Sequence, residues 1–131
     1  MEGMTFMAMG ESGHWTAMDT GPELGGQSGA SKPLELVLMG LAGCTGMDVV
    51  SILKKMRVDY QHLSIDVEAE RAEDHPKVFT DITVVYRFRG EGLDTTKLQR
   101  AVDLSAEKYC SVSAMLGKTA QITHRIEVEA V

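Results

Sequence analysis

Apolar and polar residues alternate in the second half of the chain, which is typical of strands with one buried face. Leu63, Ile65 and Val67 are each flanked by polar residues. The pattern predicts strands over residues 63–70, 78–89 and 119–128, and an earlier hairpin of two short strands over 4–9 and 14–19.

A different pattern occupies the stretch between the hairpin and these strands. Pro33 stands where a helix tolerates proline, and residues 34–53 are apolar on nearly every helical face. We predict a helix from Pro33 to about Met56 that is buried on all sides. Because 131 residues have difficulty enclosing such a helix, we infer that a second subunit covers part of it.

Three glycines recur along this helix, at Gly40, Gly43 and Gly46. Each weakens a helix by roughly 1 kcal/mol relative to alanine. Close approach of another helix or strand would compensate for that loss.

The last third of the chain predicts a further helix, with Asp94 as its N-cap. A short helix starting at Cys110 or Ser111 and ending near Gly117 follows it. The element order is β-β-α-β-β-α-α-β, which predicts a single α+β domain over residues 1–131 with antiparallel sheet.

Composition and charge exclude several classes of protein. The formal charge is -6, and no basic stripe suits binding to nucleic acid. The first residues lack the basic flank and apolar stretch of a signal peptide, and the uncharged apolar run over 36–47 is too short to cross a bilayer. We therefore expect a cytoplasmic protein that is not inserted in a membrane.

The chain has two cysteines, Cys44 and Cys110. In a reducing compartment such a pair is more often reactive, metal-binding or part of the core than a structural disulfide. Cys110 comes where one helix ends and another begins, and backbone N–H groups at a helix N-terminus lower a thiol pKa. Two thiols suffice for a peroxidase cycle in which one forms a sulfenic acid and the other condenses with it.

The segments around the two cysteines resemble a known family. Residues 33–44, PLELVLMGLAGC, and residues 109–113, YCSVS, are similar to the OsmC/Ohr family and closest to its OsmC-like branch. The likeness extends over nearly the whole chain, from the first hairpin to the last strand.

The resemblance implies an OsmC-like fold, with antiparallel sheets wrapped around a long central buried helix in an intertwined homodimer. It also implies a peroxiredoxin-like enzyme that reduces organic hydroperoxides in oxidative or osmotic stress defence. Cys44 would be the peroxidatic cysteine, Cys110 the resolving cysteine and Glu35 a further catalytic residue. A dithiol would be the reductant, and we expect neither a cofactor nor a metal.

The chain departs from the pattern of the peroxidase branches at three places. Those branches carry a glutamate directly after the proline, where this chain has Leu34, and Glu35 follows one residue later. They supply an arginine from the region before the helix, whereas the first arginine here is Arg57. Ser111 stands where a proline often follows the second cysteine.

These departures favour an alternative, a non-catalytic protein that binds a small apolar ligand or senses redox state. Phe6 and Trp15 could line an apolar pocket, although core packing is the simpler interpretation. Asp48 lies one turn after Cys44 and opposes thiolate formation, unless it binds a cation or a partner group. The histidines could in principle join the two cysteines in a zinc site, but no pair shows Cys-x-x-Cys or His-x-x-x-His spacing. They are His14, His62, His75 and His124.

Overall fold

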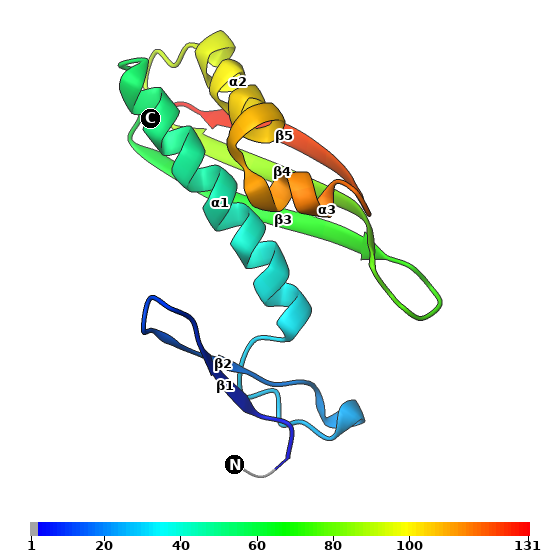
Figure 1. The fold of residues 1–131 in the computed structure, drawn as a ribbon. Helices are drawn as coiled ribbons and strands as arrows, with labels where there is room; N and C mark the ends of the chain where they lie inside the picture. The colour runs from blue at the N-terminus through cyan, green and yellow to red at the C-terminus, as the bar shows by residue number, and fades with distance from the viewer. Residues whose placement is uncertain (1–2) are drawn as a thin grey trace. The chain divides into compact units, whose positions relative to one another are not determined.

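The computed structural model describes residues 3–131 and confirms the α+β prediction (Figure 1). The chain divides into two compact units, one ending at Met39 and the other spanning Gly40–Val131. Its elements are β1 (Phe6–Met9), β2 (Trp15–Met18), the 3-10 turn η1 (Pro22–Leu24), α1 (Pro33–Lys55), β3 (His62–Arg71), β4 (Phe79–Arg89), α2 (Thr95–Leu104), the π-helical turn η2 (Ser105–Tyr109), α3 (Ser111–Leu116) and β5 (Gln121–Glu129).

Asp19 organises the first unit. It directly follows the antiparallel β1–β2 hairpin, and its buried carboxylate accepts hydrogen bonds from four groups. The donors are the backbone N–H of Thr20 (2.7 Å), Gly29 (3.1 Å) and Gln27 (3.3 Å) and the hydroxyl of Thr5 (3.3 Å). These bonds, that from Thr20 above all, lower the pKa of Asp19. The glycine-rich loop after the hairpin is therefore held by one ionised side chain.

The long helix α1 matches the predicted range to within one residue at its end. Four residues one turn apart form its buried stripe: Leu41, Thr45, Val49 and Leu53. The single chain thus buries one face of the helix, whereas the sequence predicted burial on all sides. Met47 is 76% exposed and Val50 43% exposed.

The helix α1 is also long and apolar enough to cross a membrane by length and composition alone. The core helix of a water-soluble protein passes the same test. The sequence-based expectation counted the uncharged run over 36–47 alone, and that run is only part of this helix.

The sheet of the second unit has the strand order β3-β4-β5 (Figure 1). Strands β3 and β4 are antiparallel as predicted, but β4 and β5 are parallel, so the prediction of a purely antiparallel sheet is wrong. The physical reason is the connection between Arg89 and Gln121. It carries α2, η2 and α3 back along the sheet, and a crossover of this kind is what a parallel pair requires.

The core of this unit lies between the sheet and the helices. One face of β4 is apolar and buried, with Ile82, Val84, Tyr86 and Phe88 at 0–1% exposure. The buried apolar residues of the helices include Leu41, Val49 and Leu53 of α1 and Leu98, Ala101 and Val102 of α2.

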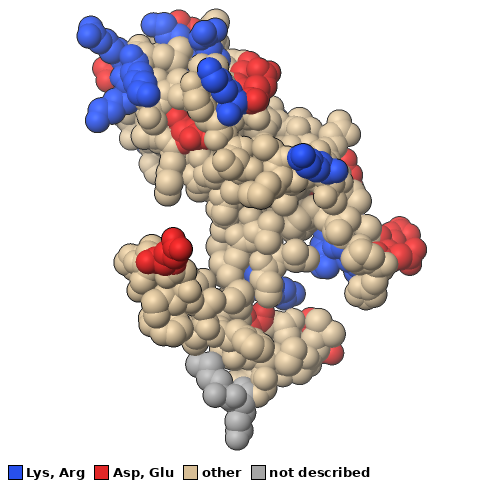
Figure 2. Space-filling model, viewed as in Figure 1, with Lys and Arg blue, Asp and Glu red and all other residues tan. Residues whose placement is uncertain are grey.

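Charged residues lie outside this core. On the other face of the sheet Arg87 pairs with Asp66 and with Glu127. Lysine and arginine side chains gather around the end of α1, where Lys54 and Lys55 form the last turn (Figure 2). Positive charge is favourable there because the helix dipole is negative at that end.

Candidate functional site: two thiols and a carboxylate

The structure brings the two cysteines together in the second unit. Sγ of Cys44, Sγ of Cys110 and a carboxylate oxygen of Asp48 all lie within 4.8 Å of one another. Both thiols are free. Cys44 is half-buried, whereas Cys110 is 3% exposed.

The two elements that carry these groups fix their positions. Cys44 and Asp48 are one turn apart on α1, so their side chains share a face of the helix. Cys110 ends the turn η2 with an extended backbone, φ -76° and ψ 102°, and caps α3. Its backbone N–H donates to the carbonyl oxygen of Ser105 (2.8 Å), and its Sγ accepts from the backbone N–H of Ser113 (3.3 Å).

The electrostatic environment of Cys110 differs from the sequence-based expectation. The sequence places it correctly at a helix N-terminus, where a lowered pKa was expected. Burial instead raises the pKa of the Cys110 thiol, and the neighbouring Cys44 thiol and Asp48 carboxylate raise it further. The single N–H from Ser113 lowers it by less than burial raises it. Desolvation therefore outweighs the helix N-terminus.

A chain of hydrogen-bonded side chains leads away from Asp48 through the core. Successive distances are 3.1 Å from Ser105 Oγ to Asp48 Oδ2 and 2.9 Å from Thr45 Oγ1 to Ser105 Oγ. Tyr86 Oη lies 2.7 Å from Thr45 Oγ1 and 2.8 Å from His124 Nδ1. The chain thus joins the central helix, the connection after β4 and both parallel strands.

The direction of these bonds follows from Asp48. An ionised carboxylate only accepts hydrogen bonds, so Ser105 donates to it and must itself accept from Thr45. By the same reasoning Tyr86 donates to Thr45, and His124 donates its Nδ1 proton to Tyr86. Every hydroxyl in the chain then both donates and accepts.

Two members of this chain have shifted pKa values. Burial raises the pKa of Tyr86 to about 12, which keeps its hydroxyl protonated at neutral pH. Burial lowers the pKa of His124, against an opposing effect of Asp103. The neutral imidazole stacks on the ring of Tyr86, with ring centroids 5.8 Å apart.

The remaining candidates occupy other places. Glu35 lies in the first unit, where its carboxylate accepts a hydrogen bond from the backbone N–H of Lys32 (3.2 Å) at the start of α1. Across the described residues 3–131, the cluster of potential ligand side chains is Cys44, Asp48 and Cys110, and it contains no histidine.

Sequence reasoning missed three members of the site: Thr45, Tyr86 and Ser105. Thr45 falls in the helical run that is apolar on nearly every face, Ser105 follows the apolar positions of the next helix, and Tyr86 stands among the apolar residues of a strand. The available signal was a hydroxyl among apolar residues, as with Tyr86 between Val84 and Phe88 on its face of the strand. A buried hydroxyl needs a partner, so such positions point to one another.

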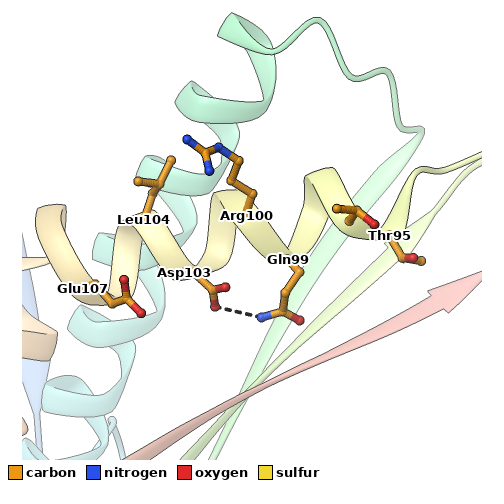
Figure 3. A pocket seen from close by; sticks show the side chains of 7 residues that line it. Thr95, Gln99, Arg100, Asp103, Leu104 and Glu107 are labelled. Atoms are coloured by element: carbon orange, nitrogen blue, oxygen red, sulfur yellow. Dashed lines mark hydrogen bonds between the residues drawn. The ribbon is translucent and has the colours of Figure 1, made fainter.

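Some of the hollows in the described residues have no thiol in their lining. A groove of about 660 Å³ runs along α2, where Gln99 Nε2 donates to Asp103 Oδ1 (2.9 Å) (Figure 3). Its lining is mainly polar and includes neither thiol. In the first unit a cavity of about 330 Å³ has a mostly apolar lining, which includes Met4, Phe6, Met7, Ala8, Met18 and Pro33.

Comparison with known proteins supplies the family. The model of the family described as OsmC-like protein matches residues 25–125, which is most of the chain. The chain belongs to the OsmC family. The resemblance found in the cysteine segments is confirmed, and the family supports a stress-related redox protein.

Individual members of the OsmC family agree with this assignment. Protein YhfA of Escherichia coli strain K12 is 46% identical over 99% of this chain and 94% of that protein. A hypothetical protein from Aquifex aeolicus is 30% identical, with a TM-score of 0.76 over 100% of this chain and 99% of its own. An organic hydroperoxide resistance protein OsmC from Legionella pneumophila is 18% identical with a TM-score of 0.68, covering 98% of both chains, and shows the shared fold.

Proposed function

We propose that this protein is a thiol-dependent peroxidase that reduces organic hydroperoxides. The observation that supports this most directly is the placement of the Cys44 and Cys110 sulfur atoms within 4.8 Å of each other. Two thiols that are this close need little movement to form a disulfide. Its similarity to a protein named for organic hydroperoxide resistance supports the choice of substrate.

The difference in exposure between the two cysteines supports Cys44 as the attacking thiol and Cys110 as the resolving thiol. Cys44 is half-buried and Cys110 is 3% exposed, so a peroxide reaches Cys44 more readily. The Cys44 thiolate attacks the O–O bond and forms a sulfenic acid, while the other oxygen takes a proton and leaves as the alcohol. The Cys110 thiol then condenses with the sulfenic acid, forming a disulfide and releasing water. An external dithiol reduces this disulfide by exchange and is itself oxidised.

The proposal includes a homodimer in the cytoplasm and a single domain per chain. The exposed side of α1, with Met47 and Val50, is apolar surface that a second copy would cover. Gly43 has open space around it among the described residues, as close approach by another chain would require. Glu35 is proposed as a further site residue, acting from the first turn of α1.

Stopped-flow oxidation tests the proposal. Pre-reduced protein is mixed with cumene hydroperoxide or with H₂O₂, and loss of thiols is followed with mass spectrometry of the product. We expect faster reaction with the organic peroxide and formation of one intramolecular disulfide. Cys44→Ser should abolish the reaction, whereas Cys110→Ser should stop at a sulfenic acid that dimedone traps. Oxidation no faster than that of free cysteine would refute peroxidase activity.

A second candidate function is binding of a small apolar ligand without turnover. The cavity of about 330 Å³ in the first unit favours it, because its lining is mainly methionine, phenylalanine and proline side chains. A fluorescent fatty-acid analogue provides the probe. Saturable binding that Phe6→Ala weakens, together with slow thiol oxidation, would favour this function over the peroxidase.

A further inference from the structure

The groups around Cys44 could also coordinate a metal ion, which is a role independent of any reaction with peroxide. Two sulfur atoms and a carboxylate oxygen converge from α1 and from the N-cap of α3. Sulfur, nitrogen and carboxylate oxygen are the donors that Zn²⁺ takes in proteins. We infer that the reduced protein binds a thiophilic divalent cation through Cys44, Asp48 and Cys110.

The spacing of the donors suits a tetrahedral ion. Metal–sulfur bonds of about 2.3 Å and metal–oxygen bonds of about 2.1 Å place tetrahedral donor atoms roughly 3.6–3.8 Å apart. The three donors lie within 4.8 Å of one another without an ion. Side-chain rotations that close each gap by at most about an ångström complete the geometry. Three protein donors leave the fourth position to water or to an added ligand.

The charges at the site also favour a cation. Each of the three groups is negatively charged or becomes so by losing a proton, and they meet in a partly buried place. The ion pairs formed by the described residues lie on the outer face of the sheet, and none of them includes Asp48. A divalent cation compensates a carboxylate and two thiolates at once, and its binding releases two thiol protons.

Surrounding hydrogen bonds orient two of the donors. Ser105 Oγ donates to Asp48 Oδ2 (3.1 Å), and the backbone N–H of Ser113 donates to Cys110 Sγ (3.3 Å). Hydrogen bonds of this kind hold metal ligands in position in metalloproteins. Because Ser105 donates to one carboxylate oxygen, the other oxygen is left to coordinate the ion.

The two sulfur donors determine which divalent cations the site prefers. Soft thiolates favour Zn²⁺ over Mg²⁺ and Ca²⁺, which prefer oxygen ligands. The sequence did not reveal this set, since Cys44 and Asp48 are four residues apart whereas the third ligand, Cys110, comes much later in the chain. The inference differs from the expectation that the protein has no metal.

Cobalt provides the direct test, using full-length reduced protein without peroxide. We expect one Co²⁺ per chain, a thiolate-to-cobalt charge-transfer band, the visible bands of tetrahedral coordination and displacement by one equivalent of Zn²⁺. Zinc binding should release two protons in weakly buffered solution and protect both thiols from Ellman's reagent. Protein carrying a Cys44–Cys110 disulfide should show none of these signals.

Substitution of each proposed ligand tests whether that residue binds the metal. Asp48→Asn should weaken Zn²⁺ at least about tenfold while the charge-transfer band persists, whereas Cys110→Ser should reduce that band strongly. Asp74→Asn, a change at an exposed loop carboxylate, is the matched control and should bind as wild type does. Thermal unfolding without metal checks that each variant is folded. A cobalt spectrum without charge transfer, or equal affinity for Asp48→Asn and wild type, would overturn the inference and leave the peroxidase proposal unaffected.

Discussion

The hydroxyl of Tyr86 lies 2.7 Å from Oγ1 of Thr45, which joins the central strand to the central helix one residue after Cys44. Both side chains are fully buried. This hydrogen bond therefore helps to position the part of α1 that carries Cys44 against β4. Removing it should affect both the stability of the fold and the chemistry of the thiols.

Tyr86→Phe should lower the free energy of unfolding by about 1–2 kcal/mol, because Thr45 and His124 each lose a buried hydrogen bond. Urea unfolding followed by circular dichroism measures this loss. Tyr109→Phe, at a half-exposed tyrosine, is the control and should change stability by less than about 0.5 kcal/mol. A Tyr86→Phe variant as stable as this control would contradict the assigned role of the hydroxyl chain.

The lowered pKa of His124 predicts a pH dependence of stability. The folded state holds His124 neutral, so the unfolded state binds its proton first as the pH falls. The contribution is fully present above the ordinary value of 6.5 and is lost as the pH falls toward the folded pKa. The groups facing the ring are Tyr86 on β4 and Asp103 on α2, and Asp103 opposes the shift.

Urea unfolding at pH 7.5 and pH 5.5 measures this dependence. His124→Asn should reduce the difference in unfolding free energy between the two pH values. His62→Asn, at the exposed start of β3, should leave that difference unchanged. An equal pH dependence in His124→Asn and wild type would rule out His124 as its source.

Asp19→Asn should loosen the loop over residues 20–32. The change removes the negative charge that accepts three backbone N–H groups, and hydrogen exchange of those amides should become at least about tenfold faster. Because the pKa of Asp19 is lowered, its stabilising effect is present above pH 3.8 and is lost as the pH falls through the folded value. Unchanged exchange in the Gln27 and Gly29 amides would show that the loop is held by other contacts.

Met47→Glu tests the proposed dimer. Met47 is 76% exposed in the single chain, so a charge there costs little in a monomer and much within an apolar interface. Sedimentation velocity should show a wild-type dimer and a shift of the variant toward monomer. Lys97→Glu, on the exposed side of α2, should leave the sedimentation coefficient unchanged. A wild-type protein that sediments as a monomer would refute the dimer itself.

Sequence patterns located every strand and every α-helix of the described residues because each has a local signal, whereas the short turns η1 and η2 were not predicted. Alternating residues marked β3, the apolar run after Pro33 marked α1, and Asp94 does cap α2, accepting from the backbone N–H of Thr96 (3.0 Å). The direction of β5 had no local signal, because the last strand reads the same in either orientation. The pKa direction of Cys110 also depended on burial, which only the tertiary structure determines.

The site was predictable where chemistry is carried by rare residues. The two cysteines are obvious candidates in the sequence because they are rare and reactive, and Asp48 follows Cys44 by one helical turn. Thr45 and Ser105 are common residues whose importance arises from meeting each other across the fold.

The parallel pairing of β5 with β4 places Cys110 on a crossover, so the sulfur site depends on contacts between residues far apart in the chain. Cys110 travels on the crossover between these strands, so it reaches Cys44 as contacts distant in sequence form, and such contacts form slowly. During synthesis Cys44 leaves the ribosome well before Cys110. Until the crossover docks, the two thiols are independent, and an oxidant present at that moment meets a nascent chain with two separate targets.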